Sequence, residues 1–138
     1  MLKMALAGLS RFLRRAEKIS DEPKVGDEQA PAHMTWYEFD NGKSAGHEGT
    51  EGGVIIFDEE HPAGARITLE SQTRTARFAI TCGVYGTLVH TRFFENEVDA
   101  HREYELMKDR LARIAAISYP DEESAYVRAI DDFMDQFP

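Results

Sequence analysis

The sequence predicts an α+β protein: an N-terminal helix, a four- to five-stranded antiparallel β meander, and two C-terminal helices packed on one face. Two observations carry this prediction. Between residues 54 and 94, runs of β-branched and aromatic residues alternate with the short turns HPAG, SQTR and GVYG. After residue 94 the spacing of apolar residues changes from two to between three and four, the period of a helix. The 138 residues suit one domain.

Residues 1–20 have the pattern of an amphipathic basic helix. Residues 21–33 contain two prolines and one glycine, which is typical of a linker. The linker leads to a single domain over residues 34–138. Leu2, Leu6, Leu9 and Leu13 share the apolar face. Such a segment suits docking on protein, an anionic membrane surface, or organelle targeting. We expect docking, on this chain or a second copy, because burying four leucines outweighs the attraction of five basic groups to a membrane.

Five segments have strand character, and a glycine-rich loop over 41–53 separates the first from the others. The segments are 34–39, 54–60, 65–70, 74–82 and 86–94. The turns predict three pairs: His61 with Ala65, Leu69 with Ala76, and Cys82 with Thr87. In HPAG, Gly64 suits the left-handed position of a three-residue hairpin loop. This register places Ile55 and Phe57 on one apolar face with Ile67 and Leu69.

Two helices complete the domain. Asn96 is a suitable N-cap for the first, which extends to about Ile117. Its apolar stripe comprises Ala100, Tyr104, Met107, Leu111 and Ile114. Pro120 suits the first turn of the second helix. Its stripe comprises Tyr126, Ile130, Phe133 and Phe137.

The single cysteine lies in the hairpin FAITCGVYGTLVHTRFF, which also holds His90. The predicted register places Cys82 on the apolar face and His90 on the opposite face. A cysteine–histidine dyad needs contact between the two side chains. We therefore expect a buried, unreactive thiol rather than a nucleophile.

The polar face of the predicted sheet offers one candidate ligand site. There Arg77 lies opposite Arg92, beside His90, and two guanidinium groups with an imidazole suit a carboxylate or a phosphate. The alternative is a solvated sheet face with weak ion pairs, Glu60 opposite Arg66 among them.

No motif indicates a cofactor or a catalytic residue. GHEGTEGG lacks the lysine and hydroxyl residue of a phosphate-binding loop, so we expect a flexible connection. Asp58, Glu59, Glu60 and His61 alternate between two faces, so we expect no metal site. Basic residues are not interleaved with aromatic ones, which argues against nucleic-acid binding.

The charge distribution favours a protein partner. The net charge is −9, of which residues 1–19 carry +4 and residues 20–138 carry −13. Such an acidic body repels nucleic acid and suits a basic partner. Small acidic α+β proteins include many toxin-neutralising immunity proteins. By this analogy we expect a non-enzymatic protein-binding or regulatory module. A homodimer is one form that this module could take. One alternative is a small-ligand or anion-binding protein or an enzyme that uses Arg77, His90 and Arg92. The other is a peripheral membrane protein anchored by the N-terminal helix. One cysteine indicates a reducing compartment, hence a cytoplasmic protein.

Overall fold

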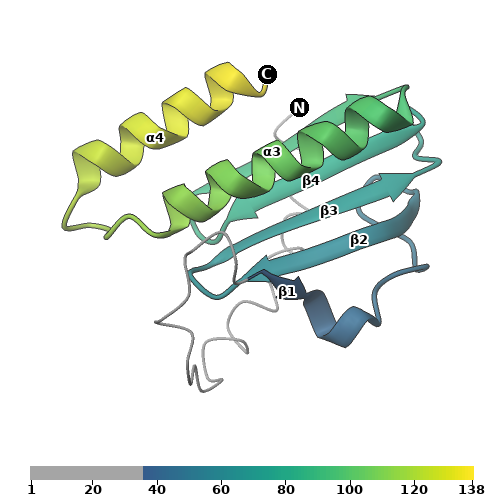
Figure 1. Cartoon of the computed structure of the whole chain (residues 1–138), viewed down its shortest axis with the longest axis horizontal. Coiled ribbons are helices and arrows are strands. Elements are labelled where there is room, and N and C mark those ends of the chain that lie inside the picture. Colours follow the sequence, from purple (N-terminus) through teal and green to yellow (C-terminus); the bar gives the residue numbers. More distant parts are fainter. Residues whose placement is uncertain (1–35) are drawn as a thin grey trace.

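The computed structural model describes residues 36–138 and contains a five-stranded antiparallel sheet followed by two helices (Figure 1). The strands are β1 (Tyr37–Glu38), β2 (Val54–His61), β3 (Ala65–Ser71), β4 (Phe78–Val84) and β5 (Leu88–Phe94), and they lie in chain order. A short 3₁₀ helix, η3 (Phe39–Gly42), follows β1. The α+β class and the meander are therefore confirmed, whereas the predicted helix over 1–20 and linker over 21–33 lie outside the described residues.

The helices form a layer on one side of the sheet (Figure 1). Helix α3 (Glu97–Ala115) contacts β3, β4 and β5, and α4 (Glu123–Gln136) packs against α3. The Asn96 side chain caps α3 by accepting a hydrogen bond from the backbone N–H of Asp99. All five residues of the predicted α3 stripe are buried. Neither α3 nor α4 has the length and apolar character that crossing a membrane requires.

The turn between β2 and β3 is as predicted, but β2 contains a bulge. His61 pairs with Ala65, and Gly64 adopts a φ of 110°. Near the start of β2 the register shifts between Ile55 and Phe57, so that Ile55 pairs with Glu70. The extra residue turns Ile55 to the face away from the helices, which corrects its predicted place beside Phe57.

The loop between β3 and β4 is longer than predicted. Strand β4 begins at Phe78, and Leu69 pairs with Ile80 rather than with Ala76. The Thr73 hydroxyl donates to the Ala76 carbonyl, 2.6 Å away, and stabilises the turn inside this loop. The shift is an even number of residues, so the side chains of β3 and β4 keep their predicted faces.

The register between β4 and β5 was predicted wrongly. Cys82 pairs with His90, not with Thr87, because a three-residue loop over 85–87 closes the hairpin. This shift is an odd number of residues and therefore turns every side chain of β5 over. His90 and Arg92 consequently share the helix-covered face with Cys82 and Ile80.

Candidate functional site

The predicted anion site rested on one shared sheet face, and the three residues do not share it. Arg77 is exposed in the loop before β4, with its guanidinium carbon 5.8 Å from the centre of the Phe78 ring. His90 and Arg92 are half-buried on β5 under the helix layer. Anion binding by these residues stays a prediction, but they do not converge as predicted.

His90 and Arg92 instead contact the C-terminal end of the chain. Nε2 of His90 lies 2.6 Å from the carbonyl oxygen of Phe137. Nε of Arg92 donates to the carbonyl oxygen of Pro138, and its Nη1 lies 2.6 Å from Oε1 of Glu103 on α3. The two side chains therefore connect β5 to both helices. Burial lowers the pKa of His90, and the Arg92 charge adds to this effect.

The opposite face of the sheet carries a buried group of polar side chains, which we call the polar face. The polar face comprises Asp58, Glu60, Arg66, Thr68, Glu70 and Thr81. Each of these residues is at most 7% exposed to solvent. Alternation along β2, β3 and β4 directs these side chains to one side. We predicted a solvated surface here. Charged side chains are rarely buried this deeply without partners, so each of these needs an account of its interactions.

Asp58 and Arg66 form a bidentate ion pair at the centre of the polar face. Nε and Nη2 of Arg66 donate to the two carboxylate oxygens at 2.9 and 2.8 Å. The guanidinium also stacks on the Phe39 ring, 3.5 Å from its centre. The pairing and the stacking fix the plane of the guanidinium within the site.

Glu60 lies beside this pair and is completely buried. As predicted, it is the direct cross-strand neighbour of Arg66. The Tyr85 hydroxyl donates a hydrogen bond to Oε2 of Glu60. Burial raises the pKa of Glu60, against the opposing effects of the Tyr85 hydrogen bond and the Arg66 charge. Burial likewise raises the pKa of Tyr85.

Glu70 anchors the glycine-rich loop over the polar face. Its carboxylate accepts hydrogen bonds from the backbone N–H groups of Glu51 and Gly53. A Cβ at Gly49 would lie 2.3 Å from Cδ of Glu70, so only glycine permits this close approach. The loop is therefore packed on the sheet and is not the flexible connection that we expected. Burial raises the pKa of Glu70, although the two N–H donors oppose this.

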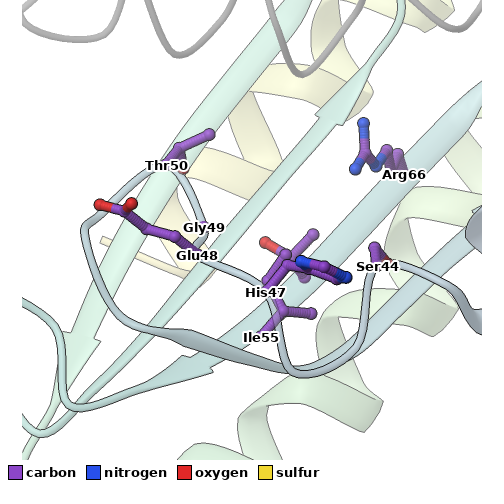
Figure 2. A pocket seen from close by; sticks show the side chains of 8 residues that line it. Ser44, His47, Glu48, Gly49, Thr50, Ile55 and Arg66 are labelled. Carbon is purple, nitrogen blue, oxygen red and sulfur yellow. The ribbon is translucent and has the colours of Figure 1, made fainter.

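A cavity of about 220 Å³ lies between this loop and the polar face (Figure 2). The loop contributes Ser44, His47, Glu48, Gly49 and Thr50, while the strands contribute Ile55, Arg66 and Thr68. Figure 2 shows the His47 ring directed toward Ser44 and the Glu48 carboxylate directed away from both. The hydroxyl oxygens of Ser44 and Thr50 are buried without a hydrogen-bond partner in the described part of the chain. A hydroxyl can both donate and accept a hydrogen bond, so Ser44 and Thr50 each keep unused hydrogen-bonding capacity beside the cavity.

Sequence reasoning missed this cavity for two reasons. The bulge that turns Ile55 into the cavity wall has no marker in VIIFDEE. Glu70 meets the loop across 17 to 19 positions of sequence, a contact that local patterns do not encode. The one available signal was the concentration of glycines over 46–53, which permits close packing of backbone on a sheet as well as flexibility.

Within residues 36–138, no three histidine, cysteine or carboxylate side chains lie close enough together to hold a metal ion. Comparisons with protein-family models, with curated proteins and with solved structures find no match for the chain.

Proposed function

We propose that the protein is a non-enzymatic binding module whose cavity takes a small, uncharged polar ligand. One observation carries the proposal: Ser44 and Thr50 line the cavity, and their buried hydroxyls have no hydrogen-bond partner in the described chain. A buried polar group without a partner costs about 1–3 kcal/mol, and a ligand that supplies the missing hydrogen bonds removes this penalty.

The charges around the cavity favour an uncharged ligand. Arg66 is the cationic group in its floor, and Asp58 already neutralises it with two hydrogen bonds. Glu60 and Glu70 lie on the same face, so an added anion meets no net positive charge. The volume matches about seven water molecules at roughly 30 Å³ each, which suits a small polyol or amide.

An NMR titration with glycerol, acetamide and acetate tests this function. Glycerol or acetamide should shift the amide resonances of Ser44, Thr50 and Thr68, whereas acetate should not. Ser44→Ala should weaken the response at least tenfold, and Ser124→Ala, an exposed change on α4, should leave it intact. Shifts confined to other residues, or a response to acetate alone, would refute the assignment.

A second function, protein binding, is favoured by the outer surface of α4. Val127 and Met134 are 48% and 37% exposed, and their spacing of seven places them on one side of the helix. The exposed carboxylates of Asp131, Asp132 and Asp135 surround them. This combination suits a partner with a basic and apolar segment, as the acidic composition predicts.

Affinity capture from the native host with two baits tests the second function. A partner retained by the wild-type protein should be lost with Val127→Glu/Met134→Glu and kept with Arg128→Gln, a matched change on the same helix. Equal retention by the first variant would remove this surface from consideration.

A further inference from the structure

The outer edge of the sheet at β5 has no strand neighbour among residues 36–138. In the described sheet β5 is the last strand, and its seven residues pair with β4 alone. An edge strand presents unpaired backbone N–H and C=O groups at alternate residues. These groups can pair with a strand from another chain.

The edge lacks three of the features that normally prevent such pairing. The strand LVHTRFF contains no proline, glycine or lysine, and its register with β4 has no bulge. Its one permanent charge, Arg92, is held toward the helix layer by Glu103 at 2.6 Å and by the Pro138 carbonyl. Natural sheets protect a long edge with lysine, proline, a bulge or a covering segment. None of the first three is present here.

The strand is also complementary to itself. Antiparallel pairing with a second copy, centred on Thr91, places Val89 opposite Phe93 and Leu88 opposite Phe94. Phe93 opposite Val89 is an aromatic residue opposite a β-branched one, which is a favourable cross-strand pair. Phe93 is 41% exposed in the single chain and would be covered. The two-fold axis repeats every pair, so each apolar position meets an apolar one.

The remaining cross-strand pair in this arrangement is His90 with Arg92, once on each side of the axis. Two positive charges there would repel each other. Burial lowers the pKa of His90, which keeps the ring neutral near pH 7. Nε2 of His90 and Nε of Arg92 already contact the carbonyl oxygens of Phe137 and Pro138 in the same chain. The pair therefore does not oppose the assembly at neutral pH.

We propose that the protein forms a symmetric dimer in which β5 pairs antiparallel with β5 of a second copy about Thr91, so that one sheet continues through both subunits. The inference is independent of the ligand function, because the cavity lies on β2, β3 and the glycine-rich loop.

Sedimentation velocity across the micromolar range tests the dimer with the full chain. The wild-type protein should sediment as a dimer. Phe93→Lys should sediment as a monomer, because it adds two charges at the interface. Phe57→Lys is the matched control on β2, since Phe57 is also 41% exposed. It should remain dimeric. A monomeric wild-type protein, or a Phe93→Lys variant that remains dimeric, would overturn the proposal.

A cross-linking variant gives a second measurement that does not depend on the folding of Phe93→Lys. Residues directly opposite each other on antiparallel strands have Cα atoms about 4.5–5.5 Å apart, which is within the range of a disulfide. Under mild oxidation, Thr91→Cys should therefore form a covalent dimer within minutes. Thr75→Cys, exposed in the loop before β4, should not. Equal cross-linking of the two variants would refute pairing about Thr91.

Discussion

Cys82 and His90 lie directly opposite each other on β4 and β5, with their side chains on the sheet face that α3 covers. Their proximity does not make the thiol a nucleophile. Cys82 is completely buried, and burial raises the pKa of its thiol far above the ordinary value. Nε2 of His90 is bound to the Phe137 carbonyl. The predicted unreactive thiol therefore follows from burial, although the predicted separation of the two side chains was wrong.

The first prediction concerns this thiol. A thiol reagent should label Cys82 slowly in the native protein and rapidly in urea, because only unfolding exposes the sulfur. Cys82→Ala should lower the free energy of unfolding by roughly 1–2 kcal/mol through lost packing. With a reagent that releases a coloured thiolate when it reacts, the absorbance of that thiolate measures the labelling. Stoichiometric labelling within seconds under native conditions would contradict the prediction.

The second prediction concerns the ion pair between Asp58 and Arg66. Asp58→Leu should lower the free energy of unfolding by about 3–5 kcal/mol, because it leaves the guanidinium buried without its carboxylate. Adding Arg66→Met should recover a large part of this loss, since two apolar side chains then replace both charges. Urea denaturation of the two single variants and the double variant measures the coupling.

The surface pair of Asp109 and Arg113 is the control for this cycle. Its side chains are 40% and 70% exposed, so Asp109→Leu should change the free energy of unfolding by at most about 1 kcal/mol. Simple additivity of the Asp58 and Arg66 changes would show that the two residues do not act as a pair.

The third prediction is a pH dependence of stability that arises from Glu60. Burial raises its pKa above 4.5, so over this window the folded protein holds a proton that the unfolded chain has released. The free energy of unfolding therefore falls as the pH rises from 4.5 through the folded-state pKa. Glu60→Gln carries no charge and should be more stable than the wild-type protein at pH 7 to 8. The difference should shrink toward pH 4.5.

Urea denaturation of both proteins between pH 4.5 and 8 measures this difference. Glu70 also has a raised pKa, but it is present in both proteins and cancels from the comparison. Glu105→Gln serves as the control, because the Glu105 side chain is 71% exposed. It should show no comparable gain with pH. A pH-independent difference for Glu60→Gln would refute a burial-raised pKa.

Local patterns predicted the parts of this fold that depend on local physics. The spacing of Ala100, Tyr104 and Met107 determined the buried stripe of α3, and Pro62 with Gly64 determined the first hairpin. The prediction failed where it depended on whether a loop has an odd or an even number of residues. GVYG is compatible with loops of different length, and an odd change in loop length reverses every side chain of β5. This one change moved His90 and Arg92 from the predicted polar face to the core side.

Local sequence patterns could not predict the candidate site, for a different reason. Alternating charges in DEEHPAGARITLE normally indicate a surface in water, whereas Asp58, Glu60, Arg66 and Glu70 are buried in the folded domain. The contact that covers Glu70 comes from a loop far away in the sequence. The loop packs closely on Glu70 because Gly49 has no side chain to clash with the carboxylate. Such long-range complementarity appears only once the chain is folded.

The last prediction concerns the attachment of α4 to the sheet. Helix α4 contacts the rest of the domain mainly through Tyr126, Phe133 and the following Phe137, and Arg92 holds the chain end just beyond them. Arg92→Met keeps an unbranched apolar stem at this position but removes the hydrogen bonds to Pro138 and Glu103. Each bond is worth about 1–2 kcal/mol at this partly exposed position. The amides of α4 should consequently exchange with solvent about tenfold faster, since about 1.4 kcal/mol corresponds to a factor of ten.

Hydrogen exchange measured by mass spectrometry distinguishes this local effect from global destabilisation. Peptides from β3 should keep their wild-type protection in Arg92→Met, because β3 lies at the centre of the sheet and β4 separates it from β5. Arg128→Met, an exposed change on α4 itself, should leave the exchange of α4 unchanged. If Arg92→Met accelerates exchange equally in α4 and β3, the side chain stabilises the whole domain. If neither segment changes, the contacts of Arg92 do not hold the C-terminal helix.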